Sequence, residues 1–479
     1  MKKHVAFLTP KYLLPICLLI IITNAIIYFN FPLLPIDSTW TLSSFYDFLR
    51  NPQSHTSLYA HEYLGKIFDF NPLHYLLLPF FELFTLNTTN FILFHFLLIT
   101  LTSFLIYRYV NNKTLASLMI LAYTLDTYTY GFRSESYLIM IIITLLMLWQ
   151  TSKNIWYKTS LCIPLTFIIG LIHPVGGIIS GLSILYLIID YYKKTNDENK
   201  TNTILKYFIF SLILTIILIG LTGLKTIEHF VYAYTHIIGE VENHFDNIHI
   251  ELLLKYIILG NSFWLIIIAY YSINNRNFAF VIYSLSILLL LLFSGRSYYC
   301  VYLIIPALLI INHISTLNQR TANWKLMPIV TLSFALPFGL TILRLCASCR
   351  ANEAGVVYKR VIEITKKKIN NSLAKQIFIP TPLSIECFLN KNQRILYPTF
   401  GIQYYAETPK GSEIFIYSSD QIKWLQRDCN KLVLGNINKW HCDTLISFTS
   451  GQYDLKSAFT MNPIPVNRIG LIKYTKIEN

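Results

Sequence analysis

Apolar residues in this chain are gathered into long blocks instead of alternating with polar residues over short distances. A helix needs about 20 apolar residues to cross the hydrocarbon core of a bilayer. The blocks, nearly free of charge, therefore predict membrane-spanning helices at 12–30, 89–109, 114–131, 136–150, 159–172, 175–191, 204–222, 251–271, 278–294, 298–314 and 326–345. The first block lacks a small-residue cleavage site, so we expect a retained anchor and not a signal peptide.

Basic residues fall in every second connector between these blocks. Lys2, Lys3 and Lys11 precede the first block, and the later basic connectors hold Arg108 with Lys113, Lys153 with Lys158, Lys193 with Lys194, Arg276, and Arg320 with Lys325. Cytoplasmic loops are enriched in Lys and Arg. We therefore expect a multi-pass protein of the inner (plasma) membrane with a cytoplasmic N-terminus. Residues 31–88, 132–135, 223–250, 295–297 and the tail are expected outside.

The pattern changes after residue 345, where the chain becomes polar. Runs at 413–417 and 431–434 have the composition of strands. The sequence thus predicts a polytopic α-helical transmembrane domain over 1–345 with about eleven helices. A soluble extracytoplasmic α/β domain is expected over 346–479. The first outer loop, 31–88, is expected to contain juxtamembrane helices, since its apolar segment 75–84 is short for a crossing.

Composition supports a membrane protein and argues against a nucleic-acid partner. Hydrophobic residues make up 54% of the 479 residues and charged residues 13%, against about 25% charged in soluble domains. The formal net charge of +14 comes mainly from connectors and tail, where basic residues set orientation. We expect the lipid bilayer as a partner and no nucleic acid.

Five of the eight cysteines lie in the tail: Cys346, Cys349, Cys387, Cys429 and Cys442. An oxidising compartment permits disulfides, with Cys429 and Cys442 as a plausible pair, and free thiols are also compatible with the sequence. A zinc site on Cys346-x-x-Cys349 is the alternative, although no second CxxC follows.

Three stretches carry a resemblance to a known superfamily. Pro35-Ile-Asp37-Ser-Thr-Trp40 places an acid just beyond the first block, and Asn71-Pro-Leu-His-Tyr75 leads towards the second. Tyr130-Gly-Phe-Arg133-Ser-Glu135 lies in an outer connector. Together they resemble the GT-C glycosyltransferases, which include protein O-mannosyltransferases and the lipid A aminoarabinose transferase. Two further stretches are similar: Gly170-Leu-Ile-His173-Pro174, and Gly295-Arg296-Ser-Tyr-Tyr299 leading to Pro306.

The resemblance implies transfer of a sugar from a polyprenyl-phosphate donor to a glycan, lipid or protein acceptor at the outer face. It implies an inverting displacement, and it leaves a divalent metal open as a cofactor. The sequence departs from the family at Asp37-Ser, where many members have Asp-Glu, at Asn71, which replaces a Pro, and at Glu135, which replaces an Asp.

Two residues carry the expected chemistry. Asp37 is the candidate base that accepts the acceptor's proton, and its alternative role is an N-cap of a following helix. Arg296 is the candidate ligand of the lipid phosphate, since a guanidinium holds two phosphate oxygens. Its alternative role is to extend to lipid headgroups.

The remaining candidates bind substrate in this interpretation. Glu135 is a second acid near the acceptor, and Arg133 either joins the site or forms an ion pair with it. Glu62 and Lys66 orient substrates or lie on a solvated helix face. The last two are Tyr299 and His173, and a helix stop at Pro174 explains the latter equally well.

Two rivals remain. A polymerase or ligase of envelope polysaccharide would use a large late outer loop, whereas the late loops here are short. A transporter or flippase of lipid-linked sugars would show charges inside the spans or paired repeats, and we expect neither here.

Overall fold

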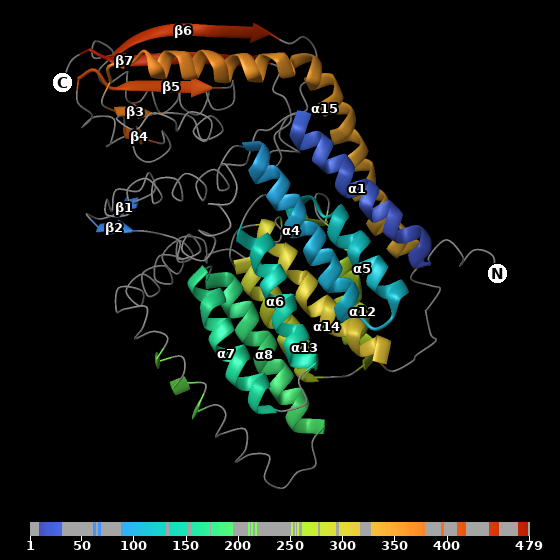
Figure 1. Cartoon of the computed structure of the whole chain (residues 1–479). Helices are drawn as coiled ribbons and strands as arrows, with labels where there is room; N and C mark the ends of the chain where they lie inside the picture. Colours follow the sequence, from blue (N-terminus) through green and yellow to red (C-terminus); the bar gives the residue numbers. More distant parts are fainter. Residues whose placement is uncertain are drawn as a thin grey trace. The chain divides into compact units, whose positions relative to one another are not determined.

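The structure is a computed structural model of the whole chain (Figure 1). It describes residues 9–30, 61–63, 66–68, 88–130, 134–151, 155–172, 174–194, 261–275, 278–293, 297–316, 327–374, 376–378, 394–396, 410–417, 440–449 and 468–477. Isolated residues between 209 and 217 and between 251 and 257 are also described.

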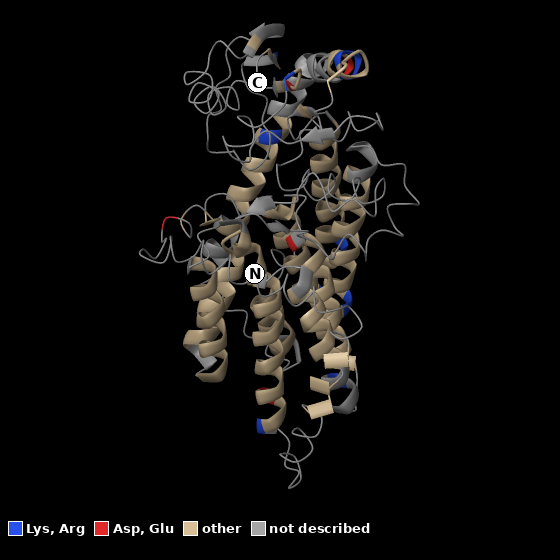
Figure 2. Ribbon diagram, turned by 90° about the vertical axis from the view of Figure 1, so that its left-hand side faces the viewer, with Lys and Arg blue, Asp and Glu red and all other residues tan. Residues whose placement is uncertain are grey.

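Helices make up most of the described chain as far as Asn370. They are α1 (Pro10–Asn30), α4 (Thr88–Tyr109), α5 (Lys113–Leu125), η2 (Thr127–Tyr130), α6 (Ser134–Thr151), α7 (Ile155–Ile172), α8 (Pro174–Lys194), α12 (Phe263–Asn275), α13 (Phe278–Phe293), η3 (Ser297–Leu303), α14 (Ile304–Thr316) and α15 (Met327–Asn370). Figure 2 shows that these helices carry few Lys, Arg, Asp or Glu residues along most of their length.

Three helices in the described part are long and apolar enough to cross a membrane: Pro10–Phe29, Ile92–Tyr109 and Val175–Lys193. Several others are apolar but shorter than a full crossing. The expected membrane association is supported by these helices, and the count of about eleven stays a prediction.

Two helix ends differ from the predicted spans for local reasons. The predicted span 114–131 is helical only to Leu125, because the carboxylate of Asp126 accepts the backbone N–H of Tyr128 (2.9 Å) and turns the chain into η2. The last predicted span, 326–345, is the first part of α15, which continues to Asn370. No proline follows residue 345 in this helix to end it.

The chain divides into two compact units, and the first contains most of the apolar helices of residues 94–342. In it α7 packs on α6 and α8, α13 lies against α8, and α12 lies against α14. The short 3-10 helix η3 contacts α6, α13, α14 and η2. The interior of this unit is built from apolar and aromatic side chains, among them Trp264, Tyr123 and Phe280.

Helix ends that the sequence assigns to the cytoplasmic side lie together in this unit. The Lys158 ammonium lies 5.3 Å from the ring centre of Trp149 and 5.6 Å from that of Tyr191. The rings of Tyr271 and His313 lie 6.0 Å apart, edge to face. The first two contacts join the last turns of α6 and α8 with the first turn of α7, and the third joins the ends of α12 and α14 with each other.

The second unit contains two sheets. Strands β1 (His61–Tyr63) and β2 (Lys66–Phe68) form an antiparallel pair. The tail contributes β3 (Gln376–Phe378), β4 (Arg394–Leu396), β5 (Glu413–Tyr417), β6 (Trp440–Thr449) and β7 (Arg468–Lys476), in the order β4-β3-β5-β7-β6. β3 is parallel to β4 and β5, whereas β7 is antiparallel to β5 and β6.

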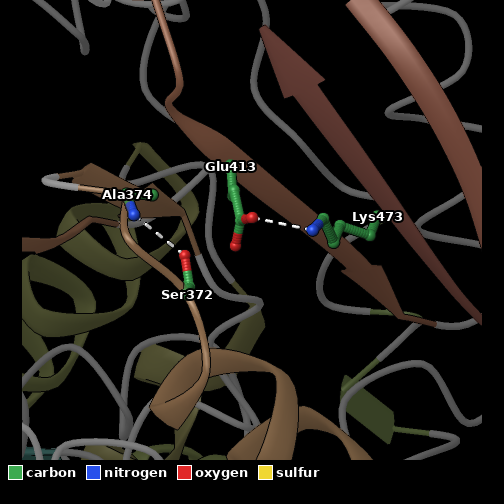
Figure 3. A network of polar contacts seen from close by, with 4 residues as sticks. All are labelled: Ser372, Ala374, Glu413 and Lys473. Carbon is green, nitrogen blue, oxygen red and sulfur yellow. Dashed lines mark hydrogen bonds and ion pairs between the residues drawn. The ribbon is translucent and has the colours of Figure 1, made fainter.

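A half-buried ion pair joins two of these strands. Lys473 Nζ donates to Glu413 Oε1 at 2.7 Å (Figure 3). The buried side chains of Ile377 and Phe415 fill the sheet's interior. Strand β5 has the bounds that the sequence predicts, and the second predicted run, 431–434, lies outside the described residues.

Candidate functional site

Segments from distant parts of the sequence meet at the ends of the helices that are predicted to face outward. The 3-10 helix η3, which directly follows the Gly295-Arg296 stretch, packs against η2 and against α6. Glu135 lies in the first turn of α6. The structure thus brings together the parts of two stretches, 130–135 and 295–299, that it describes.

The start of α8 joins the same place through a glycine. A Cβ at Gly176 would lie 2.9 Å from Leu138 Cδ1 of α6 and 3.1 Å from the Tyr302 hydroxyl of η3. Both of those side chains are fully buried. The absence of a side chain at residue 176 therefore allows α8, which follows the His173-Pro174 stretch, to approach α6 and η3 closely.

Asp126 is the central charged residue of this region, and its side chain is 0% exposed. One carboxylate oxygen accepts the N–H of Tyr128, and the other accepts the hydroxyl of Tyr256 at 2.7 Å. The indole nitrogen of Trp264 is buried and has no hydrogen-bond partner in the described part of the structure. The aromatic rings of Tyr128 and Tyr256 stack with centres 5.6 Å apart.

A second polar residue fixes the start of α12 beside Asp126. The side-chain amide of Asn261 donates to the carbonyl of Ala122 at 2.9 Å, in the last turn of α5. Its amide oxygen accepts the N–H of Phe263 at 2.9 Å. Asn261 therefore holds Trp264 and the neighbouring chain against the end of α5.

The short helix η2 is held rigidly by hydrogen bonds from neighbouring elements. The carbonyl of Thr129 lies 3.1 Å from Nε2 of His95 and accepts the Ser136 hydroxyl at 3.2 Å. The Tyr130 hydroxyl donates to the carbonyl of Thr124 at 2.7 Å. These bonds satisfy buried backbone oxygens and connect α4, α5 and α6 around η2.

Glu135 is the predicted site residue that the structure describes best. Its side chain is 3% exposed and engaged in interactions. The first turn of a helix is a favourable position for a carboxylate because of the helix dipole. Two buried carboxylates therefore lie close to η2 in the sequence: Asp126 directly before it, and Glu135 in the first turn of the next helix.

The other predicted site residues are distributed as follows. Tyr299 lies in η3 and is half buried. Glu62 and Lys66 lie in the second unit, on β1 and β2, where Glu62 pairs with Ile67 and Lys66 with Tyr63. The alternative that they lie on a helix face is therefore wrong, and the aromatic and β-branched residues around them favour strands. Four residues lie outside the described part: Asp37, Arg133, His173 and Arg296.

Sequence reasoning missed Asp126 and Tyr256. The expectation that the predicted spans hold no charge is wrong for Asp126 in 114–131 and for Arg344 in 326–345, which are both buried. Asp126 is the one acid in its predicted span, and this alone could have identified it. Nothing in the sequence marks Tyr256 as its partner across 130 residues.

No metal site is formed by the residues that the structure describes, since no three His, Cys, Asp or Glu side chains gather there. Cys346 is exposed and forms no disulfide. The expected partner of Cys442, Cys429, lies outside the described residues, so that pairing stays a prediction.

No protein-family model matches this chain, and no curated protein is significantly similar to it. The assignment of a function must therefore be argued from the residues themselves.

Proposed function

We propose that this chain is a multi-pass membrane glycosyltransferase of the GT-C type with about eleven spans. In this proposal it uses a polyprenyl-phosphate sugar and acts at the extracytoplasmic face. The N-terminus is cytoplasmic, and the tail forms a soluble outer domain that covers or shapes the acceptor site.

The observation that carries the proposal is the meeting of η2, α6, η3 and the start of α8. These elements contain the described parts of the stretches 130–135, 170–174 and 295–299, which resemble the GT-C enzymes. The first and last of them are about 160 residues apart in sequence (299 against 135). Stretches that bind one substrate must lie close together, whereas unrelated chance matches would have no reason to do so.

The two buried carboxylates add chemical support. Ionisable groups are expensive in an apolar environment and are usually retained there for function. Asp126 directly precedes η2 and Glu135 lies in the first turn of α6, and both η2 and α6 contact η3, the segment that follows Arg296.

The proposed reaction is a single displacement at the anomeric carbon. The acceptor oxygen forms the new bond to that carbon while the bond to the lipid phosphate oxygen breaks. Asp37 takes the acceptor's proton, a role worth about 10²–10⁴-fold in rate. The phosphate leaves with the electron pair and is stabilised by Arg296, and Glu135 orients the acceptor.

The experiment supplies full-length protein in lipid with radiolabelled polyprenyl-phosphate sugars and a cell-envelope extract. It compares wild type with Asp37→Asn and Glu135→Gln. Glu363→Gln is the matched control, because it removes a carboxylate from an exposed position of α15. Loss of transfer in the first two variants alone, with all proteins folded, supports the proposal. If Asp37→Asn transfers sugar as well as wild type does, the protein is still a glycosyltransferase, but Asp37 is not its base.

The buried charge of Asp126 also favours a second candidate, a transporter or flippase of lipid-linked sugars. No transfer from any monophosphate donor, together with movement of the labelled lipid across vesicles that depends on Asp126, would select it. A polymerase or ligase would instead require a diphosphate-linked glycan as donor.

A further inference from the structure

Arg344 is a buried cation in the apolar part of α15, and it belongs to the second unit. Its side chain is 4% exposed. Its guanidinium lies over the ring of Tyr28 in α1, with 5.9 Å from Cζ to the ring centre. One guanidinium nitrogen donates to the Tyr28 hydroxyl at 3.5 Å, the long limit for a hydrogen bond.

These contacts compensate the charge only in part. An arginine has five N–H donors and no acceptor, and the Tyr28 hydroxyl occupies one of them. Among the residues that the structure describes, no carboxylate forms an ion pair with Arg344. A buried guanidinium without an anion is costly, because it has lost water without gaining an opposite charge.

The neighbours of both residues on their helices are apolar and exposed. Ile26 is 44% exposed and Phe29 is 42% exposed on α1, and Leu343 is 55% exposed on α15. In a membrane such side chains contact lipid. The sequence also predicts that Tyr28 and Arg344 lie near the outer ends of their spans, at the depth of headgroups.

We propose that Arg344, held over the Tyr28 ring, binds the phosphate of a membrane lipid. The planar fork of the guanidinium holds two phosphate oxygens at once, and the apolar side chains around it contact the lipid's chains. The anion supplies the counter-charge that the described residues lack. The lipid is either an anionic phospholipid or a polyprenyl phosphate, and the phosphate chemistry is shared by both.

The competing explanation is purely structural. An arginine over an aromatic ring is itself favourable, and the pair could simply attach the tail helix α15 to α1. That role requires the ring and a cation but no anion, so it predicts no preference for one lipid class. The proposed site does not depend on sugar transfer, and either activity could be absent without the other.

The test measures lipid binding to delipidated full-length protein by native mass spectrometry. The ligands are phosphatidylglycerol, phosphatidylcholine and sugar-free undecaprenyl phosphate. The variants are Arg344→Gln, which removes the charge, Arg344→Lys, which keeps it but removes the fork, and Tyr28→Phe. Arg108→Gln is the matched control, since Arg108 is exposed at the end of α4.

We expect wild type to prefer one of the two anionic lipids to phosphatidylcholine. Arg344→Gln should weaken that binding about tenfold, Arg344→Lys less, and Arg108→Gln by no more than about twofold. Loss for phosphatidylglycerol identifies a structural phospholipid, and loss for undecaprenyl phosphate alone identifies the carrier.

Wild type that binds phosphatidylcholine equally well overturns the proposal without any variant. Unchanged anionic binding in folded Arg344→Gln also overturns it and leaves the structural pair. If Arg344→Gln does not fold, Arg344→Lys is compared with wild type instead, and unchanged binding of anionic lipid in that variant overturns the proposal.

Discussion

The hydrogen bond from Tyr256 to Asp126 is the contact that most directly tests the buried cluster. Tyr256→Phe removes one hydroxyl and leaves the ring that stacks on Tyr128. The second carboxylate oxygen of Asp126 then loses a donor at 2.7 Å in a side chain that is 0% exposed. Because water cannot replace the hydroxyl there, the buried acceptor is left unsatisfied.

The size of the effect follows from that burial. Leaving a buried acceptor unsatisfied costs about 1–3 kcal/mol, with more for charged groups. Side-chain hydrogen bonds between neutral groups in membrane proteins average only about 0.6 kcal/mol. We therefore expect Tyr256→Phe to lower the free energy of unfolding by about 1–3 kcal/mol.

Tyr283→Phe is the matched control for this measurement. The Tyr283 hydroxyl lies 2.8 Å from the Ser183 hydroxyl, both groups are neutral, and both are buried. Both variants lose a tyrosine hydroxyl, so they differ mainly in the group to which that hydroxyl is hydrogen-bonded: a carboxylate for Tyr256 and a serine hydroxyl for Tyr283. Unfolding by SDS in mixed micelles gives both free energies, and the Tyr283 variant should cost about 0.6 kcal/mol.

A double-mutant cycle completes the test. In Asp126→Asn the amide retains an acceptor for the Tyr128 N–H, and the cost of adding Tyr256→Phe should then fall by about 1 kcal/mol or more. Equal costs for Tyr256→Phe and Tyr283→Phe, together with an additive cycle, would refute the view that Asp126 depends on Tyr256.

Three further outcomes are expected from single changes. Gly176→Ala should destabilise the protein by about 1–3 kcal/mol, measured by the same unfolding, because its Cβ would lie 2.9 Å from buried Leu138. Cys346, which is exposed, should react with a membrane-impermeant maleimide added to intact cells, and labelling only after permeabilisation would place the tail in the cytoplasm. Lys473→Met should cost about 1–3 kcal/mol by leaving half-buried Glu413 unpaired, and faster hydrogen exchange in β5 and β7 would reveal it.

The sequence predicts the helices of this chain better than their ends. The lengths of the apolar blocks and the charges of the connectors predict the bounds of most described helices to within a few residues. This works because a helix in lipid needs a long apolar run however it packs. Helix ends depend on local hydrogen bonds. The side chain of Asp126 ends α5 six residues before the predicted span ends, at Leu125 instead of Gly131.

In the candidate site, too, some residues can be predicted from the sequence and others cannot. Glu135 can be found from sequence because an acid between two apolar blocks is conspicuous. The role of Tyr256 cannot, because a tyrosine in an aromatic-rich chain carries no signal until the fold brings its hydroxyl to Asp126. Glu62 and Lys66 show the limit of periodicity, since the strands that hold them span three residues each, too few to display a repeat.

Contacts between helix ends bear on the predicted topology. Lys158, Trp149 and Tyr191 meet at ends that the basic connectors assign to the cytoplasm. Tyr256 meets Asp126 at an end assigned to the outside. On that predicted topology, the chain is expected to cross the membrane an odd number of times between Tyr191 and Tyr256, and 204–222 is the only long apolar block in that part of the sequence.

The predicted crossing at 204–222 can be tested without any enzymatic activity. Without a crossing at 204–222, Tyr256 would lie on the cytoplasmic side, about 30 Å of hydrocarbon away from Asp126. In a variant whose eight native cysteines are replaced by serine, single cysteines introduced at Asn196 and at Asn243 should differ in labelling by an impermeant maleimide. The first should be protected and the second reactive in intact cells. Equal labelling at both positions would show that 204–222 does not cross the membrane. In that case either Asp126 does not lie at the outer face or its hydrogen bond to Tyr256 does not form.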